Sequence, residues 1–283
     1  MRLGISLCFL VLIFPRMSPA ETSKDLVELL PAASINWSTG VVEAKGLFPR
    51  SGPSAQEPAM QEDLHQAQRA AAENILFALK QMRMDAARDV EAIMALNPEI
   101  GARVKQLAEN AHLIQKELLS DGILQVTLRI DLLGGLSQLI LPEEIKQVEP
   151  IKPLQGVSRA KARDAEPVTE NGYSGLIVDA RGIGARPAMV PLLVDESGKQ
   201  VFGPAFVSRE YAVQYGMCGY MRSLDGSNRQ ARVGLNPLMV KGLRTLHEGT
   251  CDIVISNVDA ARLRDASANL GFLKQCRVMI VLD

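Results

Sequence analysis

Apolar side chains recur at two spacings along this chain. Residues 59–84 carry them at steps of three and four, the spacing of one face of an α-helix. Residues 123–133 instead alternate strictly between aliphatic and polar side chains, which predicts a strand with one buried face. The first part of the chain is therefore expected to be a small antiparallel sheet under a long helix.

The apolar stripe of the long helix admits two interpretations. It could be the seam of a coiled coil with a partner, or the surface that packs on the sheet. Several of its members are small, which favours packing on a sheet. The stripe consists of Leu64, Ala67, Ala71, Ile75, Leu79 and Met82.

Two further segments complete the expected first sheet. Residues 111–119 and 123–133 flank Ser-Asp-Gly, a turn sequence that predicts a hairpin. Residues 35–45 read as one strand that carries Trp37, the only tryptophan. That side chain could form a platform for a ligand, but burial against a helix is the favoured interpretation.

The second part of the chain has the signature of a mixed sheet. Residues 176–178 form a short apolar run between glycines, which predicts a strand buried on both faces. Residues 189–195 and 200–202 are expected to pair as a hairpin across a turn that contains glycine. The order strand 251–256, helix 257–270 and strand 277–282 predicts a βαβ unit with a parallel strand pair.

These patterns predict an α/β (α+β) chain of two domains, a small antiparallel sheet with a long covering helix followed by a mixed α/β sheet. The first domain is placed at 21–141 and the second at 173–283. Residues 142–172 contain four prolines and a charged run, so they are expected to be a solvated linker.

Residues 1–20 resemble a secretory signal peptide. Arg2 precedes an apolar core of about a dozen residues, and Ser-Pro-Ala forms a small-residue site that predicts cleavage after Ala20. An uncleaved membrane anchor is the alternative, but the apolar run falls short of the roughly 20 residues that span a bilayer. We expect a periplasmic or exported protein, with no transmembrane span in its mature form.

Charge and composition argue against a nucleic-acid partner. The 31 basic and 32 acidic residues nearly balance, whereas binding to phosphates needs a basic excess. Aromatic residues make up 4% of the chain, too few for base-stacking platforms.

Three cysteines follow the leader. Cys251 and Cys276 each precede an apolar strand, so they would lie at matching ends if those strands were parallel neighbours, and a disulfide between them is one expectation. The alternative is that each thiol is a small buried apolar group.

Only one loop has the composition of a possible site. Asp179, Arg181 and Arg186 follow the strand at 176–178 in a loop with two glycines. An arginine fork there could bind a carboxylate or a phosphate of a ligand or partner. The alternative is that Asp179 and Arg181 pair with each other.

The known signatures of reaction chemistry are not met. Gly182 and Gly184 lack the third glycine and the following helix of a dinucleotide site. The three histidines lie far apart in sequence, without the pairing of common zinc sites. The sequence therefore predicts no catalytic residue, no cofactor and no metal.

Two stretches carry a resemblance to a known group of proteins. Residues 36–46 (NWSTGVVEAKG) before the alanine-rich helix, and the pair 175–182 (GLIVDARG) and 251–257 (CDIVISN), resemble bacterial envelope proteins of the twenty-kilodalton lipoprotein family and the flagellar outer-membrane proteins P and T. The resemblance implies an envelope or flagellar-assembly protein without catalysis. Many members of these families carry a lipidated cysteine at the N-terminus, and this chain departs from them by having none there.

Together these observations predict a non-catalytic exported envelope protein. It would serve as a structural or assembly factor through contacts with other envelope, outer-membrane or flagellar proteins. The alternative is a periplasmic ligand-binding or hydrolytic protein that uses the loop from Asp179 to Arg186.

Overall fold

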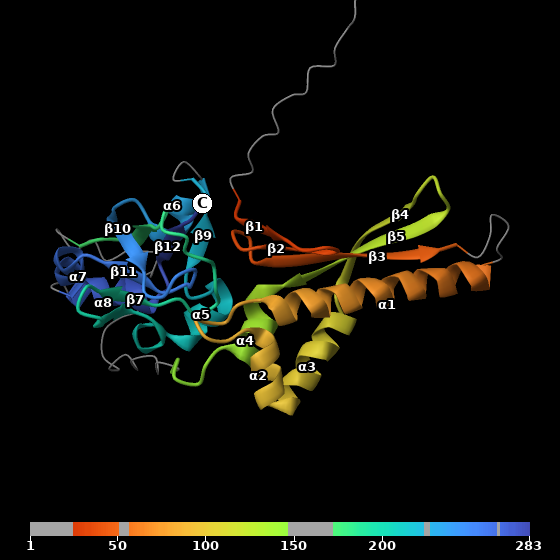
Figure 1. Cartoon of the computed structure of the whole chain (residues 1–283), viewed down its shortest axis with the longest axis horizontal. Helices are drawn as coiled ribbons and strands as arrows, with labels where there is room; N and C mark the ends of the chain where they lie inside the picture. The colour runs from red at the N-terminus through yellow and green to blue at the C-terminus, as the bar shows by residue number, and fades with distance from the viewer. Residues whose placement is uncertain (1–24, 51–56, 147–171, 224–226, 265–266) are drawn as a thin grey trace, which may run out of the picture.

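The computed structural model describes residues 25–50, 57–146, 172–223, 227–264 and 267–283. Two sheets lie side by side, each with its own helices (Figure 1). The predicted fold class, a small antiparallel sheet with a long helix followed by a mixed sheet, is confirmed. The leader with its cleavage site after Ala20, and residues 147–171 of the linker, lie outside the described residues.

The first sheet is antiparallel throughout. In sheet order its strands are β1 (Val27–Leu29), β2 (Ala33–Asn36), β3 (Val41–Pro49), β5 (Ile123–Asp131) and β4 (His112–Leu118). The predicted hairpin of β4 and β5 is confirmed. Residues 35–45 do not form one strand, because Asn36 caps a turn between β2 and β3 by accepting the N–H groups of Ser38 and Thr39.

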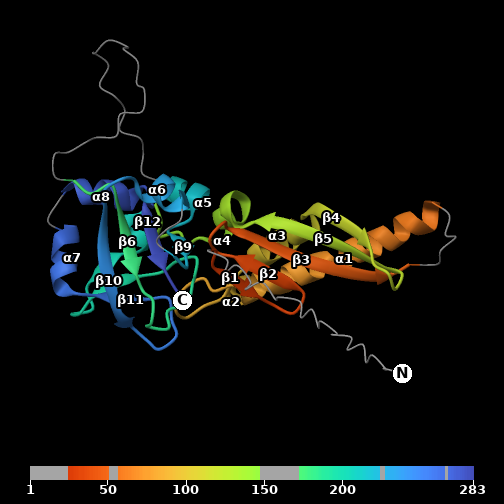
Figure 2. The same cartoon turned by 90° about the horizontal axis from the view of Figure 1, so that it is seen from above.

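Helix α1 (Glu57–Gln81) runs along the first sheet and packs on β3 and β5 (Figures 1 and 2). The predicted stripe is the buried face, since Ala67, Ala71, Ile75 and Leu79 are fully enclosed. The facing residues of β3 and β5 are in register, with Val42 opposite Ile130. The stripe is therefore a core surface and not a coiled-coil seam.

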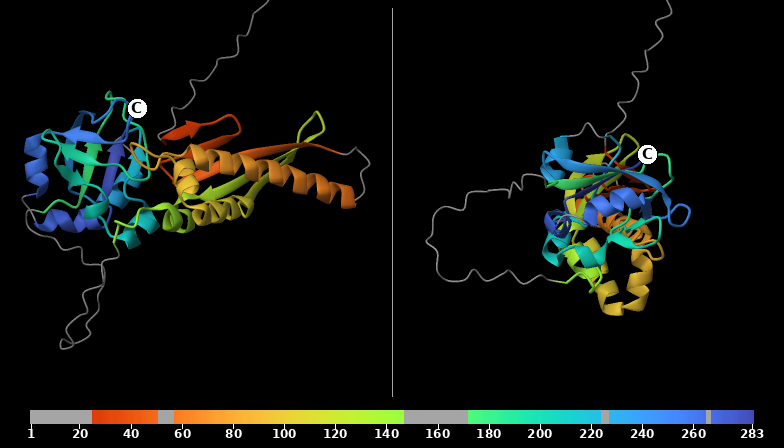
Figure 3. Two further views of the ribbon diagram at one scale, coloured as in Figure 1. Left: turned by 60° about the horizontal axis from the view of Figure 1, so that its bottom comes forward. Right: turned by 90° about the vertical axis from the view of Figure 1, so that its left-hand side faces the viewer.

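Two shorter helices project from the α1 side of this sheet (Figures 1 and 3). They are α2 (Val90–Leu96) and α3 (Pro98–Glu109). Asn97 separates them and caps α3, accepting hydrogen bonds from the backbone N–H groups of Glu99 and Ile100. After β5, the helical turns Leu132–Leu136 and α4 (Ser137–Ile140) lead out of the first sheet.

The second sheet is mixed and has seven strands. In sheet order they are β8 (Gln200–Phe202), β7 (Leu193–Asp195), β11 (Ile253–Ile255), β10 (Pro237–Thr245), β6 (Gly175–Asp179), β12 (Val278–Val281) and β9 (Gly219–Met221). Strands β10, β6, β12 and β9 are parallel. The hairpin of β7 and β8 forms as predicted, although β7 is shorter than the run 189–195.

Helices cover both faces of the second sheet. Leu176 and Val178 of β6 join the core that includes Phe272 and Leu273 of α8, whereas Ile177 packs with Val233 of α6. A strand covered on both faces is what the apolar run at 176–178 predicts. The helices are α5 (Arg209–Tyr215), α6 (Ser227–Val233), α7 (Asn257–Arg264) and α8 (Ser267–Lys274), with a helical turn at Pro204–Phe206.

The predicted βαβ unit is wrong in its strand pairing. Strands β11 and β12 are separated by β10 and β6. Because β11 is antiparallel to β10, while β10, β6 and β12 are mutually parallel, β11 runs opposite to β12. The predicted helix over 257–270 corresponds to α7 and α8, and α8 continues past Gly271 to Lys274.

Buried contacts join the two sheets. Trp37 is buried, and its ring packs edge-on against Tyr220 of β9 in the second sheet, with 5.9 Å between ring centroids. The Ser38 hydroxyl donates to the Tyr220 carbonyl oxygen at 2.8 Å. The backbone N–H of Val190 donates to the Met84 carbonyl oxygen at 2.7 Å.

None of the described helices combines the length and the apolar character needed to cross a bilayer.

Candidate functional site

The structure brings together two of the three charged residues of the loop after β6. Arg181 donates from Nε to Asp179 Oδ1 at 2.8 Å and from Nη2 to Asp179 Oδ2 at 2.6 Å. These hydrogen bonds lower the pKa of Asp179 below its usual value. The two charges therefore satisfy each other without a ligand, as the pairing interpretation of this loop expects.

Arg186, the third charged residue of this loop, bonds a different segment of the chain through its backbone. Its backbone N–H donates to the Thr250 carbonyl oxygen at 3.2 Å, and its side chain is exposed. Gly182 has φ +79°, and its backbone N–H donates to Asp283 Oδ2 at 2.7 Å. The glycine turn is thus anchored to the C-terminal residue, which fixes the loop.

The disulfide between Cys251 and Cys276 is not present, because Cys218, Cys251 and Cys276 are all free thiols. The expectation required β11 and β12 to be neighbours, but two strands separate them. Strands lie about 4.8 Å apart, so three steps across the sheet exceed the roughly 4.4–6.8 Å between the Cα atoms of a disulfide. The correction follows from strand order.

All three thiols are buried, which agrees with the apolar alternative. Burial raises the pKa of Cys218 to about 11 and that of Cys276 to about 12, and it also raises the pKa of Cys251. A thiolate is the reactive form of cysteine. At neutral pH these side chains are thus protonated and unreactive.

Strand β4 forms an exposed edge of the first sheet, and all seven of its residues are exposed. It pairs with β5 on one side only, and α1 packs on β3 and β5. Leu113 and Leu118 lie opposite Leu128 and Leu124 in register, so they extend the buried face of the sheet beyond its helical cover. We name Leu113, Ile114 and Leu118, with the free strand edge, the β4 edge.

The β4 edge has the chemistry of a protein-binding surface. Its three apolar side chains are large and exposed, and 51% of the surface of Leu118 is accessible. A free strand edge also offers unpaired N–H and C=O groups to an incoming strand. The register shift between Leu113 and Gln115, together with the charges of Lys116 and Glu117, limits open-ended pairing with identical edges.

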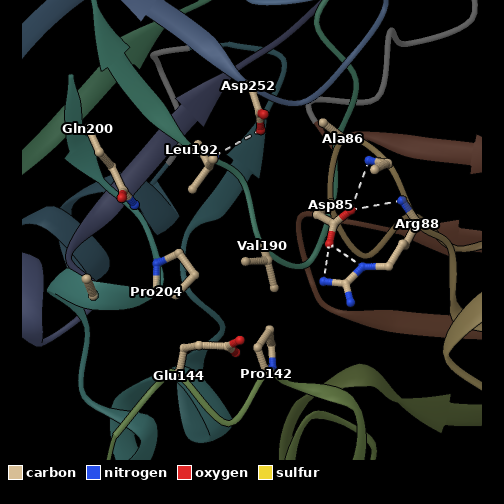
Figure 4. Close-up of a pocket in the computed structure, with 12 residues that line it drawn as sticks. Asp85, Ala86, Arg88, Pro142, Glu144, Val190, Leu192, Gln200, Pro204 and Asp252 are labelled. Atoms are coloured by element: carbon tan, nitrogen blue, oxygen red, sulfur yellow. Dashed lines mark hydrogen bonds and ion pairs between the residues drawn. The ribbon is translucent and has the colours of Figure 1, made fainter. Parts of the chain in front are cut away.

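A cavity of about 570 Å³ lies where the two sheets meet (Figure 4). The cavity is lined by the loop after α1, by the chain after α4 and by residues of the second sheet and its loops. The lining residues that carry polar or charged groups are Asp85, Arg88, Glu144, Gln200 and Asp252. Val190 and Leu192 form apolar wall between Asp252 and Glu144 in this view.

Asp252 is the buried carboxylate of this cavity, with 5% of its surface exposed. Its Oδ1 accepts the Leu192 N–H at 3.3 Å and the Cys251 thiol at 3.3 Å. Among the described residues no group donates to its Oδ2. Burial raises the pKa of Asp252, the nearby Asp85 adds to that rise, and His247 opposes it.

No sequence pattern marks this cavity or the β4 edge as a site. Residues 85–88, 142–144 and 190–252 meet only after the two sheets have packed, so no local spacing marks the cavity. Strand β4 was predicted from its hairpin, but its edge position depends on the order of the other strands. Within the described residues no group of three His, Cys, Asp or Glu side chains is placed to share a metal ion.

Comparison with known proteins gives a match for the second-sheet part. Residues 175–283 match a family model described as the second domain of Treponema pallidum Tp0624. That description names no activity, and the match gives no support to the lipoprotein or flagellar families. No curated protein matches the chain. The part of the chain from β6 to the C-terminus is thus similar to a domain of a bacterial protein.

Proposed function

We propose that this chain is an exported protein of the bacterial envelope that acts through contacts with other proteins and not by catalysis. Its role is structural or in assembly, with outer-membrane or flagellar components as partners. The signal-peptide pattern of residues 1–20 and the resemblance of residues 36–46 support the compartment and the class of partner.

The β4 edge is the observation that carries this proposal. Burying one of its aliphatic side chains against a partner would stabilise the complex by roughly 1.5–3 kcal/mol. A partner strand added to β4 would also satisfy its free backbone groups, in the mode known as β-augmentation. Affinity would come from these backbone bonds, and specificity from the pockets that receive Leu113 and Leu118.

The charged pair of the loop after β6 and the described cysteines also support a non-catalytic role. Asp179 and Arg181 are paired with each other. The three buried thiols are protonated at neutral pH, because burial raises their pKa values. These side chains serve the fold and are not held ready for bond-making.

The test is capture of partners from intact envelopes after chemical crosslinking. We would compare the tagged wild type, the double variant Leu113→Glu/Leu118→Glu, and the control Leu96→Glu. Leu96 is exposed at the end of α2, away from the β4 edge, so the control adds the same charge elsewhere. All three proteins should show the same unfolding midpoint, because the altered side chains are exposed.

We expect a partner that the wild type and Leu96→Glu retain and that the double variant loses at least tenfold. Equal capture by all three proteins would refute the role of the β4 edge. Capture of no specific partner by the wild type would refute the proposed function itself.

A further inference from the structure

We propose that the cavity between the two sheets binds a small organic cation, an amine or guanidinium group on an apolar body. The charged group would bond Asp252, and the body would lie on Val190 and Leu192. This binding site is separate from the β4 edge, and it does not depend on the proposed function.

The charges around the cavity favour a cation. Arg88 donates from Nε and Nη2 to Asp85 Oδ2 at 2.9 and 2.7 Å, so these two charges cancel. Glu144 and Asp252 remain, and both are acidic. An anionic ligand would meet two carboxylates and one arginine that is already paired.

Asp252 supplies the specific contact. Burying an ionised carboxylate is costly unless it is paired and hydrogen-bonded. Its Oδ1 accepts a long hydrogen bond from the Leu192 N–H and a bond from the Cys251 thiol, a weak donor, and its Oδ2 has no donor among the described residues. Figure 4 shows the carboxylate beside Leu192 on the cavity wall. An ammonium or guanidinium group in the cavity would supply the missing donor and the opposite charge.

The volume and the lining of the cavity indicate the size and the apolar character of the ligand beyond its charged group. A volume of about 570 Å³ falls within the range of small-molecule sites, roughly 300–1,000 Å³. The wall is mainly apolar, made by Val190, Leu192, Pro142, Pro204 and the alanines Ala86, Ala87 and Ala205. A ligand with a short alkyl chain would bury that chain against these groups, whereas an inorganic cation would leave them uncovered.

Burial also raises the pKa of Asp252 in the empty cavity. A bound cation would favour the ionised carboxylate and reverse that shift. Asp85, which also lines the cavity, adds to that rise in pKa, whereas His247 opposes it.

The test is calorimetric titration of the full chain with three probes of one length: pentylamine, pentanol and pentanoate. The variants are Asp252→Asn, which removes the buried charge with little change of shape, and Glu144→Gln, which removes an exposed charge. Glu99→Gln is the control, because Glu99 is exposed on α3 and does not line the cavity.

We expect pentylamine to bind at one site, at least tenfold more tightly than pentanol or pentanoate. Asp252→Asn should weaken pentylamine binding tenfold or more, and Glu99→Gln should leave it unchanged. If Asp252→Asn fails to fold, a weaker affinity for pentylamine in Glu144→Gln tests the same charge requirement. The proposal is overturned if pentanoate binds as tightly as pentylamine, if neither cavity variant changes the affinity, or if no saturable binding occurs up to about 10 mM.

Discussion

Gly46 of β3 lies where helix α1 comes closest to the first sheet. A Cβ added there would lie 2.0 Å from the Ala67 carbonyl oxygen and 2.4 Å from the Ala71 backbone nitrogen. Both are backbone atoms of α1, so no rotation of a side chain can relieve the overlap. We therefore expect Gly46→Ala to be strongly destabilising although it adds one methyl group.

The magnitude follows from the distance that α1 must move. A carbon and a carbonyl oxygen in close contact are about 3.3 Å apart, so the helix must withdraw by about 1.3 Å. A gap of 0.5–1 Å already loses about a quarter to a half of the attraction between packed atoms. Ala67, Ala71 and Ile75 are fully buried in this interface. The loss should lie at the upper end for overpacked cores, about 3 kcal/mol.

The measurement is thermal and urea unfolding followed by circular dichroism. A loss of about 3 kcal/mol corresponds to a fall in the melting temperature of about 6–12 °C for a chain of this size. Gly271→Ala is the matched control, because nothing lies within 4 Å of its added Cβ inside α8. That variant should be more stable than the wild type, by up to about 1 kcal/mol. A Gly46→Ala protein as stable as the wild type would refute this packing of α1 on β3.

Three other predictions follow from buried groups. Tyr220→Phe should lower the free energy of unfolding by about 1–3 kcal/mol in urea titrations, because the hydroxyl bonds a backbone N–H and a carbonyl at 3.0 and 2.8 Å. Non-reducing mass mapping should find no disulfide among the described cysteines, and maleimide should label them only after unfolding; labelling of the native protein would contradict their burial. These cysteines are Cys218, Cys251 and Cys276. Hydrogen bonds from the Ser197 hydroxyl and from Arg264 lower the pKa of Asp195 in the native protein. The ionised carboxylate therefore adds to the free energy of unfolding in full above its usual pKa of 3.8, and this contribution is lost as pH falls through the lower native pKa. The difference in melting temperature between the wild type and Asp195→Asn should therefore shrink in acid, and a constant difference would contradict this linkage.

Much of the fold is predictable from local sequence patterns. The stripe of α1 predicted its buried face, because a helix repeats every 3.6 residues whatever lies beside it. Asn97 before Pro98 is also a local helix-start pattern, and Asn97 accepts two backbone N–H groups at the start of α3. The alternation of 123–133 likewise identified the buried face of β5. Each of these features depends on residues close together in sequence.

Features that depend on long-range order were missed. The separation of β11 from β12 by β10 and β6 is set by packing across the whole sheet, and the disulfide expectation was wrong for that reason. The carboxylate of Asp252 lines a cavity with Asp85, 167 positions earlier in the chain (252 − 85 = 167). The pairing of Asp179 with Arg181 lay within reach of the sequence, because the two residues are two positions apart.

The two proposed surfaces would act independently. The β4 edge belongs to the first sheet, whereas the cavity lies where the two sheets meet. A ligand in the cavity would contact residues of both parts, including Asp85 and Asp252. Because the β4 edge and the cavity share no residue, variants at one of them should leave binding at the other unchanged.

The most direct test of the account is site-specific photo-crosslinking in intact cells. A photoreactive amino acid would replace Ile114 on β4 in one protein, and Leu96 at the end of α2 in another. Both side chains are exposed, so both proteins should fold. The account predicts a discrete adduct with an envelope protein from position 114 and none from position 96. Equal adducts from both positions, or none from position 114, would contradict it.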